Sequence, residues 1–230
     1  QLYVWMNTVR SARFGENLLP AGDFEDPKLL AESGWVTENY VQETLTTTLS
    51  SQTGGMDGGR CLRLTSQPKQ ARQLDSLPPF IDHPAVAVRT PMIAVETGNL
   101  IRIRVHVKVP VGFIPGAGGV IVRDSLGGPA LQFRTTEAIP TWREVVLYRR
   151  APASGAMAVT LALAGHGEAL FDRLVVERIE DVGGGPAADR VATRADAATT
   201  TDPTLSRPRT PPAPATNPVT SPGAPPSRRD

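Results

Sequence analysis

Four polar side chains alternate with apolar ones in the ten-residue run LIRIRVHVKV, from Leu100 to Val109. These polar residues are Arg102, Arg104, His106 and Lys108. A β-strand projects alternate side chains onto one face of a sheet, so these four would form a row of hydrogen-bond donors. The row would suit a carboxylate or an anionic glycan if Arg123 or Arg134 joined it from neighbouring strands. The alternative is an ordinary solvated face of a half-exposed antiparallel sheet.

Residue types that perform catalysis do not form a recognisable motif. The histidines His83, His106 and His166 lack the spacing of a metal-binding pair. Ser125 follows Asp124 in RDSLGG, which is typical of a hairpin turn and not of a nucleophile elbow. The glycine clusters lack the lysine and the following helix that a phosphate-binding loop requires. We therefore expect a protein that is not an enzyme.

Composition narrows the classes of partner. The chain of 230 residues has 24 Lys plus Arg against 23 Asp plus Glu, so we expect no broad nucleic-acid-binding surface. Cys61 is the only cysteine, which excludes an intramolecular disulfide and a zinc–thiolate cage. The longest apolar stretch, residues 156–164, is far short of the roughly 20 residues that span a bilayer. Because the chain begins with Gln1, we expect upstream domains in a longer parent protein.

From residue 17 onward, short runs of period-two alternation are separated by segments rich in Gly and Pro, such as QTGGMDGG, SLPP and PGAGG. This pattern is typical of an antiparallel all-β protein. The runs lie at residues 44–50, 60–66, 100–109, 119–124, 130–134, 142–149, 157–164 and 169–178. Eight or more strands predict an antiparallel β-sandwich of jelly-roll type over residues 17–182, with no helix needed inside it.

The two ends of the chain differ from this region. Leu2, Trp5, Met6 and Val9 have the i, i+3, i+4, i+7 spacing of a helical face, so residues 1–16 predict a short amphipathic N-terminal helix and a linker. Residues 183–230 contain no aromatic residue and ten of the 22 prolines. Such a segment cannot bury enough apolar area to offset the entropy of ordering, which predicts a disordered C-terminal tail. The tail would be either a spacer or an extension without a role.

Three segments, in this order, resemble the carbohydrate-binding modules of the galactose-binding-like jelly-roll superfamily. NLLPAGDFEDPKLLAESGW, residues 17–35, is similar to the opening strand of these modules, with N-L-x-x-x-G-x-F-E and a later Gly-Trp. TWREVVLYRRAP, residues 141–152, resembles their Trp-led strand that ends at Ala-Pro. GEALFDRLVVE, residues 167–177, resembles the closing strand. In overall texture the chain also resembles the C-terminal regions of large planctomycete proteins.

The resemblance implies a calcium site. In such modules the opening and closing strands lie side by side, and a structural calcium ion commonly binds where they meet. Carried over by position, the ligands would be Glu25, Asp172 and, through its side chain or its carbonyl, Asp23, which supply the hard oxygen atoms that calcium prefers. The family often has two successive acids in the closing strand, whereas Arg173 follows Asp172 here. Arg173 would then neutralise Glu25 in place of a cation, or backbone N–H groups would satisfy a buried carboxylate.

The resemblance also implies a function: a non-catalytic carbohydrate-binding accessory module of a larger extracellular or cell-envelope protein. Members of the family place an aromatic ring against a sugar and polar groups on its hydroxyls. The candidate ligand-binding residues are Arg102, Arg104, His106, Trp35 and Phe113. Packing is the commoner explanation for Trp35, and Phe113 would otherwise cover the end of the sandwich. The competing hypothesis is a structural or protein-interaction sandwich without a sugar site, since fold does not fix function.

Overall fold

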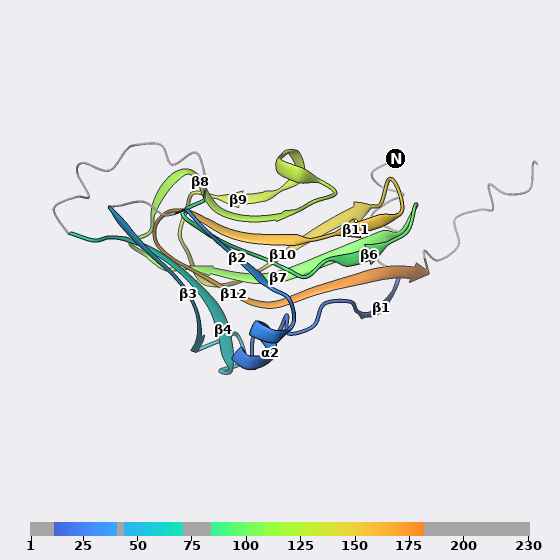
Figure 1. Cartoon of the computed structure of the whole chain (residues 1–230), viewed down its shortest axis with the longest axis horizontal. Coiled ribbons are helices and arrows are strands. Elements are labelled where there is room, and N and C mark those ends of the chain that lie inside the picture. The colour runs from blue at the N-terminus through green and yellow to red at the C-terminus, as the bar shows by residue number, and fades with distance from the viewer. Residues whose placement is uncertain (1–11, 41–43, 71–83, 182–230) are drawn as a thin grey trace, which may run out of the picture. The chain divides into compact units, whose positions relative to one another are not determined.

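The computed structural model describes residues 12–40, 44–70 and 84–181 (Figure 1). The chain divides into a unit of residues 1–185 and a unit of residues 186–230, and all described residues belong to the first. The expected helical face at residues 2–9 and the expected tail at residues 183–230 lie outside the described residues. The expected linker does not extend to residue 16, because Arg13–Asn17 form strand β1.

The described residues fold as an antiparallel β-sandwich of jelly-roll type, as predicted. The strands are β1 (Arg13–Asn17), β2 (Val36–Asn39), β3 (Leu45–Thr53), β4 (Arg60–Pro68), β5 (Val86–Arg89), β6 (Ile93–Val95), β7 (Leu100–Val109), β8 (Ile114–Asp124), β9 (Phe133–Thr135), β10 (Ile139–Arg150), β11 (Gly155–Met157) and β12 (Val159–Asp181). Residues 130–134, expected as one strand, are divided between a 3-10 helix, η2 (Gly128–Leu131), and β9.

The long strand β12 belongs to both layers of the sandwich (Figure 1). Its C-terminal half lies between β7 and β4 in the order β10–β7–β12–β4–β3, and β1 pairs with its end; we call these strands the β7 sheet. Its N-terminal half lies between β5 and β8, which β2 and β9 extend; we call these strands the β8 sheet. The sequence predicted two separate strands here, at 157–164 and 169–178.

The predicted alternation of β7 is confirmed. Its apolar side chains are fully buried, whereas its polar side chains are half-buried. The buried set is Ile101, Ile103, Val105, Val107 and Val109. They pack with residues of the β8 sheet, such as Val88, Val120 and Leu161, in one continuous core. Burial of each such side chain contributes about 1.5–3 kcal/mol. A one-residue register shift would instead bury the polar set, so the pattern fixes which face meets the core.

One short helix lies inside the region that was expected to contain none. Helix α2 (Pro27–Glu32) begins after Asp26, whose Oδ1 accepts hydrogen bonds from the N–H groups of Lys28 at 2.8 Å and Leu29 at 3.2 Å. An aspartate N-cap followed by proline is a recognised helix-start signal. The apolar side chain of Leu30 anchors α2 to the core.

The opening and closing segments lie side by side, but the opening strand is displaced from its predicted position. The segment that resembles the opening strand begins at Asn17, whereas β1 ends at Asn17 and residues 18–26 are not in a strand. This loop still follows β12: the N–H of Leu18 donates to the carbonyl oxygen of Val176, and the N–H of Leu174 donates to that of Gly22, both at 2.8 Å. The meeting of the two segments therefore places the candidate metal ligands.

Candidate functional site

A groove of about 640 Å³ lies on the outer face of the β8 sheet. Its floor includes Ala87 of β5 and Ile121 of β8, and both pair with the buried Ala162 of β12 that lies between them. These side chains are buried and form a small cluster with Ala164, separate from the main core. Alanines leave open the space that longer side chains would fill, so the floor is hollow.

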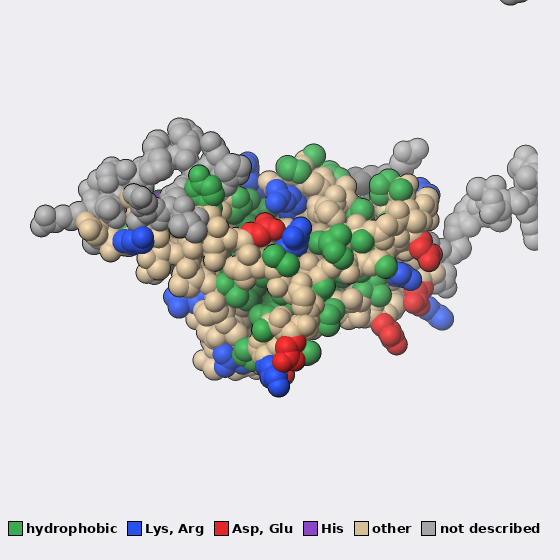
Figure 2. All heavy atoms as spheres, viewed as in Figure 1, with side chains coloured by type: hydrophobic (Ala, Val, Ile, Leu, Met, Phe, Trp, Pro, Cys, Tyr) green, Lys and Arg blue, Asp and Glu red, His purple; other side chains and the backbone are tan. Residues whose placement is uncertain are grey.

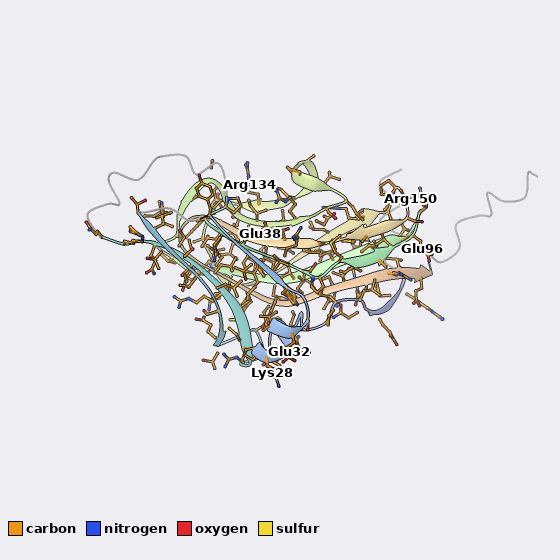
Figure 3. The ribbon with its side chains drawn as sticks, viewed as in Figure 1. Lys28, Glu32, Glu38, Glu96, Arg134 and Arg150 are labelled. Carbon is orange, nitrogen blue, oxygen red and sulfur yellow. The ribbon has the colours of Figure 1, made fainter. Side chains whose placement is uncertain are left out.

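Polar side chains stand at both sides of this floor. Glu38 of β2 pairs with Ala87, and Arg134 of β9 pairs with Ile121, so one register row crosses five strands from Glu38 to Arg134. Both line the groove, and Figure 3 labels them. Tyr40, which is half exposed, adds an aromatic ring to the Glu38 side. In Figure 2, acidic and basic side chains lie among hydrophobic ones in the part of the face where Figure 1 draws β2 and β9.

The groove continues along the strands. A second hollow of about 250 Å³ shares Glu38 and Arg123 with the groove and reaches Met92 and Ser125. Residues that line the two hollows lie between residues 117 and 125. At roughly 3.3 Å per strand residue, this part of the chain is about 25 Å long. This length suits an extended ligand better than a single small ring.

The predicted polar row of β7 lies on the other sheet, and carboxylates occupy it. Arg102 Nε donates to Glu177 Oε2 at 2.8 Å, and the Arg102 guanidinium lies over the ring of Phe14, 3.1 Å from its centroid. Arg104 contacts carboxylate oxygens of Glu144 at 3.3 Å and Glu177 at 3.4 Å. Only 16% of the Arg102 side chain is exposed. These guanidinium groups already have counter-charges within the protein.

Arg123 and Arg134 do not join that row. Both come from strands of the β8 sheet, so they line the groove and not the face of β7. The sequence could not place them, because one-strand alternation does not reveal which sheet a strand enters.

A hollow of about 380 Å³ brings together three of the predicted site residues, Arg104, His106 and Asp23. It lies between β7, β12 and the loop that follows β1. His106 Nδ1 and Arg104 Nε are buried there without a hydrogen-bond partner among the described residues. Those atoms are covered by the protein itself, so a ligand in the hollow would not reach them directly.

The two predicted aromatic residues are used in packing. Trp35 Nε1 donates to the carbonyl oxygen of Pro20 at 3.3 Å, and its ring meets the ring of Phe24 edge-on with centroids 5.4 Å apart. Phe113 is half-buried and packs against the core. A Cβ atom on Gly165, in the bend of β12, would lie 2.8 Å from Phe113 Cε2. Neither ring lines the groove.

The carboxylates of Glu25 and Asp172 are held by the same glycine-rich loop, residues 54–60. The N–H of Met56 donates to Asp172 Oδ2 at 2.6 Å, and the N–H of Arg60 donates to Glu25 Oε2 at 2.9 Å. Gly55 is needed for this approach, because a Cβ atom there would lie 2.6 Å from the Arg60 carbonyl oxygen and 2.8 Å from Asp172 Oδ2. The loop therefore closes over both acids.

The electrostatics of this pair favour a positive partner. Burial raises the pKa of Asp172, and the negative charge of Glu25 raises it further, whereas hydrogen bonds from the N–H groups of Met56 and Arg173 lower it. The side chain of Arg173 forms an ion pair with Asp57, so it does not fill the position expected for a cation. Among residues 12–40, 44–70 and 84–181, no group of three or more His, Cys, Asp or Glu side chains could hold a metal ion. A cation here would need backbone carbonyl oxygens beside the two carboxylates.

Strained backbone surrounds the same pair. Within the described part of the chain, the non-glycine residues with positive φ are Ala21 at 55°, Phe24 at 59° and Arg173 at 50°. Each lies within four residues of Glu25 or Asp172. Left-handed conformations of such residues cost on the order of 1–3 kcal/mol each and cluster at functional sites.

No protein-family model matches the sequence, and no curated protein matches it. Similar solved structures include a putative sugar binding protein from Bacteroides thetaiotaomicron, at 11% identity and a TM-score of 0.46, covering 71% of this chain and 100% of that one. The CBM22-1 xylan-binding domain from Paenibacillus barcinonensis Xyn10C aligns at 11% identity and a TM-score of 0.42, covering 74% and 99%.

The enzymatically active domain of tailspike protein 4 from bacteriophage CBA120 aligns at 10% identity and a TM-score of 0.42, over 71% of this chain. This chain spans only 21% of that larger one. All of these TM-scores lie below 0.5, so the likeness assigns neither a ligand nor an activity to this chain.

No helix in the described ranges is long and apolar enough to cross a membrane.

Proposed function

We propose that this chain is a non-catalytic carbohydrate-binding accessory module of a larger extracellular or cell-envelope protein, and that its ligand lies in the groove of the β8 sheet. The observation that carries this proposal is the construction of the groove: a small-residue apolar floor between polar side chains, with the ring of Tyr40 beside it. A sugar presents an apolar ring face surrounded by hydroxyl groups. A groove with an apolar surface and polar margins complements that distribution.

The acids of the groove support binding and not bond cleavage. Glycoside hydrolysis generally requires a pair of carboxyl groups about 5–9.5 Å apart, one of them free to transfer a proton. The described carboxylates that line the groove and its continuation are Glu38 and Asp124. Glu38 is paired with Arg89 at 3.5 Å, and Asp124 is buried against Arg149 at 2.7 Å. Neither is placed as a free acid.

Binding of the full 230-residue chain to a glycan array and to insoluble polysaccharides tests the function, and a filled groove tests the site. Ala87→Phe would fill the floor, so we expect at least a tenfold loss of glycan affinity. Ala94→Phe introduces the same side chain at an exposed position of β6, outside the groove, and should bind normally. Equal binding by both variants would move the site elsewhere. Absence of binding to any glycan would favour a structural or protein-interaction domain.

We further propose that a structural calcium ion joins the carboxylates of Glu25 and Asp172, with the carbonyl oxygen of Asp23 contributing from the adjoining turn. Two neighbouring carboxylates provide hard oxygen atoms, and the nearby Arg173 is paired with Asp57 and not with them, which gives a reason for a cation to bind. Backbone carbonyl groups of residues 54–60 would complete the six to eight oxygen ligands that calcium takes. Such an ion would hold this loop against β12.

A further inference from the structure

We infer that the groove selects an acidic polysaccharide, whose carboxylate or sulfate groups bind Arg123 and Arg134. This inference rests on the proposed function, because it names the ligand class of the same groove.

Both arginines are placed on the groove side of the sheet by strand register. Arg123 pairs with Thr160 and lies two residues from Ile121 on β8, so its side chain leaves the same face as that floor residue. Arg134 pairs directly with Ile121 from the neighbouring strand β9. The two backbone positions are about 7 Å apart along the strands and one strand spacing, about 4.8 Å, apart across them. Two anionic groups of one polymer, or one group between them, can therefore meet both.

Their charges have no carboxylate partner within the described part of the protein. Arg134 Nη1 donates only to the carbonyl oxygen of Ala117, at a long 3.5 Å, and the side chain of Arg123 makes no hydrogen bond or ion pair with any described residue. The nearby acids are already engaged, Glu38 with Arg89 and Asp124 with Arg149. Arg123 is nevertheless half-buried. A half-buried guanidinium that lacks a counter-charge is a ready partner for an anion.

The β7 sheet provides an internal comparison. Its outward arginines, Arg102 and Arg104, contact the carboxylates of Glu177 and Glu144. Arg63 on the same sheet is paired with Glu168. Three arginines of the β7 sheet thus have carboxylate partners, whereas neither arginine of the groove has one among the described residues.

The chemistry of the guanidinium group decides the ligand class. Its planar fork donates two parallel hydrogen bonds to a carboxylate or sulfate, and such charge-assisted bonds are about twice as strong as neutral ones. The apolar floor beside it lowers the local dielectric constant and strengthens the attraction. A neutral glycan would bind in the same hollow but would leave both charges uncompensated.

Two matched pairs of polymers separate charge from sugar type: polygalacturonate against its methyl ester, and dextran sulfate against dextran. The full chain should bind at least one acidic polymer at least tenfold more tightly than its neutral counterpart, and added salt should weaken that binding. Preference for polygalacturonate alone identifies the carboxylate, and preference for dextran sulfate alone identifies the sulfate.

The double variant Arg123→Gln and Arg134→Gln should reduce acidic-polymer affinity to that of the neutral polymer. The control variant Arg143→Gln and Arg150→Gln changes the same net charge at exposed positions of β10, outside the groove, and should bind as the wild type does. Thermal unfolding checks that each variant is folded. If a double variant does not fold, the single arginine variants are measured in its place.

The failure of this inference is distinguishable from failure of the proposed function. If Ala87→Phe abolishes binding but the groove arginine variant does not weaken it, the groove binds sugar without selecting charge, and the inference is overturned. Equal losses in the groove and control variants would show non-specific attraction and also overturn it. If no polymer binds at all, the proposed function falls as well.

Discussion

The guanidinium of Arg149 donates to Oδ2 of Asp124 at 2.7 Å, and less than a tenth of either side chain is exposed. Arg149 comes from β10 of the β7 sheet and Asp124 ends β8 of the other sheet, so the pair links the two layers. Asp124 Oδ1 also accepts hydrogen bonds from the N–H groups of Leu126 at 3.0 Å and Gly127 at 2.8 Å. One acid therefore fixes both an inter-sheet contact and the turn after β8.

Removing this acid should be costly. Asp124→Ala leaves the Arg149 guanidinium buried without its counter-charge, which typically lowers the free energy of unfolding by about 3–5 kcal/mol. Glu168→Ala, which breaks the partly exposed pair with Arg63, should cost about 1 kcal/mol or less. Urea unfolding of the two variants provides the comparison, and similar losses would show that the inter-sheet pair has no special weight.

The loop that holds the two acids should tolerate no side chain at Gly55. Gly55→Ala would press a Cβ atom against the Arg60 carbonyl oxygen and Asp172 Oδ2, and such overpacking costs about 1–3 kcal/mol. The matched control is Gly155→Ala, since nothing lies within 4 Å of a Cβ atom there. That variant should be unchanged or more stable by about 0.4–1 kcal/mol. Thermal melting that ranks the two variants the other way would contradict the described loop.

Calcium should raise thermal stability of the wild type by mass action, by about 2.7 kcal/mol at a concentration 100 times the dissociation constant. Asp172→Asn should abolish this gain, whereas Glu168→Gln, on the same strand but away from Glu25, should keep it. Calorimetry with added calcium and then with excess EGTA measures both effects. An unchanged melting temperature of the wild type at high calcium concentration would refute the proposed calcium site.

Without calcium, Asp172 should make stability depend on pH. Burial and Glu25 raise its pKa in the folded state, so the folded protein binds this proton more tightly than the unfolded chain does. The favourable contribution is complete below the unfolded pKa, about 3.9, and is lost as pH rises through the raised pKa of the folded state. Asp172→Asn lacks this loss. Its stability relative to wild type should therefore increase over that pH window in EGTA, and parallel pH curves would refute the effect.

The sequence predicted best those strands that have one apolar face and one polar face. β7 was predicted with its observed bounds, because its alternation separates a core face from a polar face residue by residue. β12 was predicted as two strands, because Gly165 and Gly167 lie between two apolar runs and indicate a turn. In the structure these glycines permit the bend by which one strand passes from one sheet to the other. Gly167 has a φ of 117°, and Gly165 has no room for a Cβ atom.

The groove could not be predicted from the sequence in the same way. Ala87 and Ile121 at its floor, and Ala162 between them, come from three separated segments and have no distinctive local pattern. Only strand register brings them into one row. Resemblance to a family placed Glu25 and Asp172 where the opening and closing strands meet, and the structure shows in addition that residues 54–60 contact both. Asp26 and Pro27 are a local signal for the start of a helix, but we did not predict α2 because the surrounding period-two alternation indicated strands.

β12 has a consequence for the order of events during synthesis on the ribosome. Five antiparallel pairs, β2–β5, β3–β4, β6–β11, β7–β10 and β8–β9, contain only strands that leave the ribosome before β12 does. Neither sheet has its central strand until β12 is translated. The nascent chain must therefore keep several strand pairs with unpaired edges apart until that late segment emerges. Non-local pairing of this kind folds slowly and exposes edges to aggregation, so the last strand is the one on which completion of the sandwich depends.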